Sequence, residues 1–177
     1  MAHSGWRIVL VSTVPIVAQT LAATLRELGH RPVAVIAARR DRPMPDRPSM
    51  TDETAPAGLD LLLPASKHAI QPLVSSYEPD LLLCWGFPWK IPSTALQVPR
   101  LGSVNCHPAM LPRHRGPIPM AWALREGDGQ YGVTWHRMDP ELDTGAILAQ
   151  SVVPMEDDDF DITVVGPRIG SVALGLL

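Results

Sequence analysis

An amide and an imidazole lie two positions apart near the middle of the sequence, where Asn105 and His107 belong to the segment SVNCH. This segment predicts a short strand, and alternate residues of a strand point to the same face. Asn105 and His107 are therefore expected to share one face, with Val104 and Cys106 on the other. Pro108 ends the strand, and ligands bind at the carboxyl ends of strands in open α/β sheets. The pair could act on such a ligand; alternatively, Asn105 caps a turn and His107 is a structural hydrogen-bonding residue.

Charged residues follow this pair in two further segments. The loop PAMLPRHRGPIP carries Arg113 and Arg115 directly after the predicted strand. Asp143 lies in the link between two strand candidates, 131–138 and 146–153. These two strands are expected to pair antiparallel, because the link is too short for a parallel crossover.

The same sequence disfavours several other chemistries. The histidines never occur four residues apart with a glutamate between them, and neither Cys84 nor Cys106 belongs to a C-x-x-C pair, so no metal site is expected. No G-x-G-x-x-G pattern occurs, which argues against a dinucleotide-dependent oxidoreductase. Cys106 beside His107 could suggest a thiol nucleophile. Strand neighbours point to opposite faces, however, so Cys106 is expected to be a small buried thiol.

The elements that would position these residues alternate along the chain. Strands are predicted at 6–12, 32–38, 59–63, 80–84 and 102–107, and helices at 17–28, 67–77 and 119–126. A closing helix is expected from residue 160 onward, interrupted at Gly166 and Pro167. The segment 39–57 has no apolar period and predicts a loop. This order predicts a three-layer, Rossmann-like α/β domain with a mostly parallel sheet and an antiparallel addition near its C-terminal end.

Composition sets outer limits on the function. The 177 residues are 46% hydrophobic, which is enough for one core of ordinary size. The net charge of -3 argues against a surface built wholly to coat nucleic acid. The apolar runs are shorter than the roughly 20 residues that a membrane span needs, so no membrane association is expected. Two cysteines do not make a disulfide framework, and a reducing cytoplasm is the expected compartment.

Taken together, the motifs resemble those of the formyltransferases that use 10-formyltetrahydrofolate. The shared pattern is Asn-x-His, Leu-Pro-x-x-Arg-Gly, Gly-Val-Thr and Leu-Asp-Thr-Gly, found here at 105–107, 111–116, 132–134 and 142–145. The resemblance runs from residue 7 to residue 150 and is densest after residue 81. It is greatest for the amino-terminal catalytic domain of the methionyl-tRNA formyltransferases.

This resemblance implies that Asn105, His107 and Asp143 form a catalytic trio. When an amine adds to a formyl carbonyl, the carbonyl oxygen gains negative charge, and Asn105 and His107 would bind this oxyanion. Asp143 would orient or charge the imidazole and help to take the proton from the attacking ammonium. The reaction needs no metal.

The resemblance also implies that loops around the trio hold the pteridine end of 10-formyltetrahydrofolate, largely through backbone groups. The residues of these loops are Trp85, Gly86, Phe87, Ile91, Pro92, Met110, Leu111, Pro112, Leu142 and Thr144. For the aromatic residues among them, the alternative is the packing of a loop onto the sheet.

Four arginines are the candidates for acceptor binding. Arg113 and Arg115 could meet the glutamate tail of the folate or an acceptor phosphate, or they could face solvent. Arg40 and Arg42 lie in a basic insertion that, in the tRNA-acting relatives, touches the acceptor stem at about this place. The alternative is an ordinary solvated charged loop.

Two positions depart from the pattern of the relatives. Ala109 stands where a serine is common, and the first turn, Ser12 to Pro15, lacks the usual glycine. Neither change affects the trio. The missing glycine weakens any role of this turn in cradling a phosphate, because close backbone approach normally needs glycine.

The resulting hypothesis is an N-formyltransferase that moves the formyl group of 10-formyltetrahydrofolate to a primary amine, with initiator methionyl-tRNA as the first candidate acceptor. The alternatives are an enzyme that formylates an amino sugar nucleotide or another small amine in specialised metabolism, a 10-formyltetrahydrofolate hydrolase, and a non-catalytic folate-binding module. Residues 1–177 are expected to form one catalytic domain. The tRNA-acting relatives carry a second, basic domain, so this chain is expected either to be truncated at its C-terminus or to end in a helix that packs on a partner.

Overall fold

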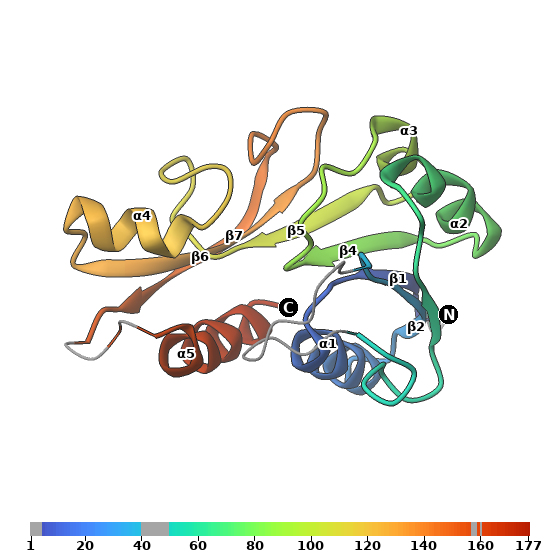
Figure 1. Ribbon diagram of the computed structural model, residues 1–177, viewed down its shortest axis with the longest axis horizontal. Coiled ribbons are helices and arrows are strands. Elements are labelled where there is room, and N and C mark those ends of the chain that lie inside the picture. The colour runs from blue at the N-terminus through green and yellow to red at the C-terminus, as the bar shows by residue number, and fades with distance from the viewer. Residues whose placement is uncertain (1–4, 40–49, 157–158, 160) are drawn as a thin grey trace. The chain divides into compact units, whose positions relative to one another are not determined.

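The computed structural model describes residues 5–39, 50–156, 159 and 161–177 (Figure 1). Its contacts divide the chain into two compact units, residues 1–104 and 105–177. Arg40 and Arg42, two of the predicted acceptor-binding residues, lie outside the described residues.

The first unit is built on parallel strands. Strand β1 (Arg7–Val11) lies between β2 (Arg31–Ile36) and β4 (Leu81–Trp85), and β3 (Asp60–Leu62) pairs with the far edge of β2. Helix α1 lies on one side of these strands, and α2 and α3 lie on the other (Figure 1). The helical segments of this unit are α1 (Pro15–Glu27), the 3-10 turn η1 (Lys67–Ala69), α2 (Ile70–Ser76) and α3 (Ser93–Leu96).

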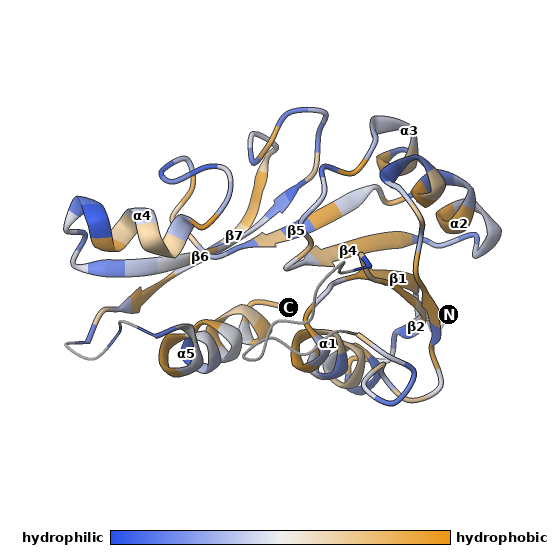
Figure 2. Ribbon diagram, viewed as in Figure 1, coloured by the Kyte–Doolittle hydropathy of each residue, from blue (hydrophilic) through white to orange (hydrophobic). Residues whose placement is uncertain are grey.

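The apolar run at the start of the sequence explains the centre of this unit. Residues 8–11 of β1 are fully buried, as expected for a strand covered on both faces, and Figure 2 shows β1 and β4 as hydrophobic ribbons. Helix α1 buries Leu21 and Leu25 on one stripe, and the chain leaves it through Gly29 at a φ of 82°. The predicted strand, helix and strand order of this region is confirmed.

The second unit contains the antiparallel addition. Strand β5 (Ser103–His107), whose last three residues open the unit, is followed by α4 (Pro119–Glu126), β6 (Gln130–Arg137), β7 (Ile147–Pro154) and α5 (Ile162–Gly175). The strands follow the order β5-β6-β7, and β6 and β7 pair antiparallel, as predicted. Their register shifts between Trp135 and His136. Helices α4 and α5 lie on opposite sides of these strands (Figure 1). The predicted α/β class, mostly parallel with an antiparallel C-terminal pair, is confirmed.

The closing helix differs from its prediction. The sequence predicts an interruption at Gly166 and Pro167, but α5 is continuous and contains Pro167. A proline inside a helix removes one N–H and crowds the carbonyl of the preceding turn. Two features offset this cost. Asp161 caps the helix by accepting a hydrogen bond from the N–H of Thr163 at 2.8 Å, and the stripe formed by Val165, Ile169 and Ala173 is buried.

Helix α5 packs on β6 and β7, and the Nε1–H of Trp135 donates to the carbonyl of Ala173 at 2.8 Å. Trp135 is buried. We expect Trp135→Phe to lower the free energy of unfolding by about 2 kcal/mol, since it removes a buried hydrogen bond and leaves a void. Urea unfolding followed by circular dichroism measures the change. The matched control is Trp122→Phe at an exposed position on α4, which should cost less than about 0.5 kcal/mol. Equal losses in the two variants would contradict the prediction.

Among the described residues, none of the helices has both the length and the apolar character that crossing a bilayer requires.

Candidate functional site

Four polar side chains meet in the second unit, where β5 and β6 end and the link between β6 and β7 turns back. They are Asn105 and His107 of β5, His136 of β6, and Asp143 of the link. The structure therefore brings together the three residues that the sequence predicts, and it adds His136 to them. The imidazoles of His107 and His136 are buried, with 5% and 1% exposure, whereas Asn105 and Asp143 are half-buried.

The carboxylate of Asp143 is the centre of this group. Its backbone has a φ of 55°, a left-handed conformation that aspartate adopts more readily than most residues. The carboxylate accepts a hydrogen bond from the N–H of Gly116 at 2.8 Å. Its oxygens lie 3.4 Å from Nε2 of His136 and 3.6 Å from Nδ1 of His107. Burial alone raises the pKa of the Asp143 carboxyl, but the His136 imidazole, the Gly116 N–H and the charge of His107 outweigh it and lower this pKa. Asp143 is therefore ionised at neutral pH.

His107 has both ring nitrogens near acceptors. Its Nε2 lies 2.9 Å from the carbonyl oxygen of His114, and a carbonyl can only accept, so Nε2 carries the proton. Burial lowers the pKa of His107, and the attraction of Asp143 opposes that shift without cancelling it. In the neutral ring, Nδ1 thus faces Asp143 without a proton between them. The sequence predicts that His107 donates a hydrogen bond to an oxyanion. In this structure, its N–H donates to the carbonyl of His114 instead.

The lowered pKa of His107 predicts a pH dependence of stability. Its folded pKa lies below the unfolded value of about 6.5, so the unfolded state binds more protons in this range, and stability falls as the pH drops below about 6.5. We expect His107→Gln, which cannot titrate but can still donate to His114, to lose less unfolding free energy than the wild type between about pH 7.5 and pH 5. Urea unfolding across this range tests it. Parallel pH profiles for the two proteins would contradict the assignment.

His136 was missed by the sequence reasoning. Its Nε2 lies 3.2 Å from Nδ2 of Asn105, and its Nδ1 lies 2.8 Å from the carbonyl oxygen of Arg137. Strand alternation alone would have placed His136 on the face opposite Trp135, but not beside Asn105. In the structure, Trp135 points toward α5 through its bond to Ala173. The register shift at this position marks an irregularity of the kind that re-aims side chains near active sites.

The predicted folate-binding residues of the second unit lie near the trio in sequence, and the backbone of Leu111 is held on both sides. The N–H of Leu111 donates to Oγ1 of Thr134 at 3.3 Å, and the carbonyl of Leu111 accepts from Nε2 of Gln150 at 2.9 Å. Met110 and Pro112 flank Leu111. In the link, Leu142 is exposed, and Oγ1 of Thr144 donates to Asp139 at 2.7 Å.

The other predicted folate-binding residues belong to the first unit. The side chains of Trp85 and Ile91 are buried, which for the aromatic Trp85 agrees with the packing alternative. Gly86 has a φ of 70°, and its carbonyl accepts from the N–H of Thr13 at 3.1 Å. Phe87 and Trp89 make an edge-to-face contact at 5.6 Å, and Pro92 precedes α3. A role of these residues in binding folate stays a prediction.

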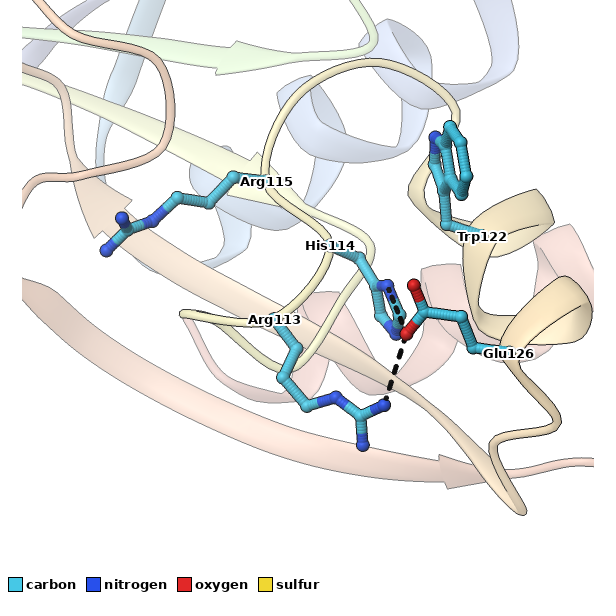
Figure 3. A pocket seen from close by; sticks show the side chains of 5 residues that line it. All are labelled: Arg113, His114, Arg115, Trp122 and Glu126. Atoms are coloured by element: carbon cyan, nitrogen blue, oxygen red, sulfur yellow. Dashed lines mark hydrogen bonds and ion pairs between the residues drawn. The ribbon is translucent and has the colours of Figure 1, made fainter.

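Arg113 and Arg115 have different surroundings. A hollow of about 340 Å³ is lined by Arg113, His114, Arg115, Trp122 and Glu126 (Figure 3). Nη2 of Arg113 lies 2.6 Å from Asp128 and 3.5 Å from Glu126. Arg115 points away from Glu126 and Trp122 (Figure 3), and its guanidinium forms no ion pair with any described residue. Arg115 is therefore the better placed of the two to meet an anionic ligand.

Around this hollow, His114, Glu126 and Asp128 offer possible metal ligands within 4.8 Å of one another. Nε2 of His114 lies 2.7 Å from Asp128, and Arg113 forms ion pairs with both carboxylates. Arg113 thus compensates one of the two negative charges of the cluster.

Comparison with known proteins gives consistent matches. The sequence profile of a family described as "Formyl transferase" matches residues 5–165. A methionyl-tRNA formyltransferase of Citrifermentans bemidjiense is 32% identical over 188 aligned residues, which cover 98% of this chain and 56% of the relative. A GDP-perosamine N-formyltransferase of Brucella melitensis is 34% identical over 102 residues, or 58% of this chain and 39% of the relative.

A solved structure shows the same fold. The phosphoribosylglycinamide formyltransferase from Streptococcus pneumoniae superposes with a TM-score of 0.75 at 25% identity, covering 97% of this chain and 94% of that one. The match to the solved structure covers nearly all of that chain. The alignment with two of the methionyl-tRNA formyltransferases, however, covers only 56% and 59% of their length.

Proposed function

The chain belongs to the formyl transferase family, and we propose that it moves the formyl group of 10-formyltetrahydrofolate to a primary amine. The proposal rests on the contacts of the ionised Asp143 carboxylate. One of its oxygens lies 3.6 Å from Nδ1 of the neutral His107 ring. Its other oxygen lies near His136, which in turn contacts the amide of Asn105. An amide donor and a proton acceptor side by side are what acyl transfer to an amine requires.

Asn105 is the donor for the developing oxyanion. Its Nδ2 carries two hydrogens, and His136 is its partner among the described residues, so the second N–H is available to a formyl oxygen. This donor is fixed in place before the reaction and therefore costs little reorganisation when the charge appears. The residues present thus fit a formyl donor, and the cosubstrate supplies the activated one-carbon group when it is bound.

Asp143 and His107 together accept the proton. The attacking nitrogen must lose a proton when it bonds to the formyl carbon, and the ionised Asp143 can take that proton directly or through water. The unprotonated Nδ1 of His107, 3.6 Å away, then stabilises the proton between the two groups. The proton is returned when the nitrogen of the folate leaves, so the protein ends the cycle in its starting state.

The acceptor is proposed from the relatives. A methionyl-tRNA formyltransferase matches along 98% of this chain, so methionyl-tRNA is the first acceptor to test. A GDP-perosamine N-formyltransferase shows higher identity, 34%, over a shorter stretch, which favours an amino sugar nucleotide as the second candidate.

The test follows the absorbance change of 10-formyltetrahydrofolate with the purified chain. Incubations contain no amine, methionyl-tRNA, or an amino sugar nucleotide. Turnover that depends on an amine supports transfer and identifies the acceptor class. Turnover without an amine identifies a hydrolase instead. The absence of turnover in every incubation, with folate binding retained in calorimetry, would replace the proposal by a non-catalytic folate-binding module.

A further inference from the structure

We propose that His136 is a positioning residue that fixes the amide of Asn105. This inference rests on the proposed function for its kinetic consequence, but the contact itself can be observed without activity. It starts from the two partners of the ring: the Arg137 carbonyl at 2.8 Å from Nδ1 and the Asn105 amide at 3.2 Å from Nε2.

The carbonyl of Arg137 determines which nitrogen carries the proton. A carbonyl oxygen only accepts hydrogen bonds, so Nδ1 of His136 must be protonated to make its 2.8 Å contact. In the neutral ring, Nε2 then carries a lone pair and can only accept. Nδ2 of Asn105 is a donor, so the 3.2 Å contact is a hydrogen bond from Asn105 to His136.

This bond orients the whole amide of Asn105. An asparagine amide can turn by half a revolution and exchange its oxygen for its nitrogen. With Nε2 of His136 as a fixed acceptor, one of the two orientations gains a hydrogen bond and the other brings two acceptors together. The second N–H of Asn105 is thereby held toward the position of the reacting carbonyl. His136 is 1% exposed, so its ring does not exchange this partner for bulk water in the intact site.

The kinetic test compares two substitutions. His136→Gln can place an amide oxygen near the position of Nε2, whereas His136→Leu has similar bulk and no acceptor. We expect His136→Leu to lower kcat about 10-fold or more with KM changed less than about threefold, because the interaction acts on the transition state. We expect His136→Gln to keep kcat within about threefold.

A spectroscopic test needs no activity. Asn105 is the only asparagine in the sequence, so ¹⁵N-asparagine labelling gives one side-chain amide pair. In the wild type, the two side-chain amide hydrogens of Asn105 should exchange with solvent at clearly different rates, because one of them is donated to His136, and the difference should persist in His136→Gln. Equal exchange of the two hydrogens in the wild type would overturn the proposal, whether or not His136→Leu folds. An inactive wild type with the expected difference would contradict the formyl-transfer function and leave the contact standing.

Discussion

Asp143→Asn is expected to lower kcat for formyl transfer by about 10² to 10⁴, the usual effect of removing a general acid–base group. The variant keeps the shape of the side chain, and its amide oxygen can still accept from the N–H of Gly116, which lies 2.8 Å from the carboxylate. Its Nδ2 hydrogens can point to the unprotonated nitrogens of His107 and His136. The variant should therefore fold normally, but it cannot take a proton from the attacking amine.

The measurement is kcat and KM with a saturating acceptor, together with thermal unfolding. Glu141→Gln is the matched control, because it removes one negative charge from an exposed position of the same link. We expect the control to keep kcat within about threefold. If Asp143→Asn raises KM and leaves kcat unchanged, the carboxylate binds the acceptor and does not accept the proton.

Asn105→Ala is expected to lower kcat by about 10² to 10³, the range observed when one oxyanion donor is removed. The donor is half-buried on β5, and among the described residues no second side-chain amide contacts His136 or Asp143, so none can replace it. The free energy of unfolding should fall by only about 1 kcal/mol, since one hydrogen bond to His136 is lost.

Gln130→Ala serves as the control for this variant, since it removes an exposed amide at the start of β6. Single-turnover kinetics with bound 10-formyltetrahydrofolate separate the chemical step from product release. An Asn105→Ala enzyme with an unchanged single-turnover rate would show that another group stabilises the oxyanion.

Much of the architecture follows from local sequence patterns. Three local features leave few conformations open, and the structure agrees with the prediction at each. They are the apolar run of β1, the Gly29 that follows α1, and the short link between β6 and β7. Helix α3 was not predicted, because four residues are too few to show a helical period. The prediction for α5 failed for another reason. Burial of Val165 and Ile169 offsets the proline, and burial depends on neighbours that are distant in the sequence.

The candidate site, like the fold, could be predicted from the sequence only in part. The resemblance to the formyltransferases implied Asn105, His107 and Asp143, and the structure brings them together. The commitment of the His107 N–H to the carbonyl of His114 could not be predicted, because it depends on the path of a loop. His136 carries no motif of its own, and only the three-dimensional meeting of two strand ends and a turn reveals its contacts.

The groups that contact the Asp143 carboxylate, His107, Gly116 and His136, lie with Asn105 between residues 105 and 143, within one unit of the chain. The spacing of the reactive groups is therefore set by short connections inside a single compact unit. A substitution elsewhere in the chain that leaves this unit folded is expected to leave their mutual distances unchanged.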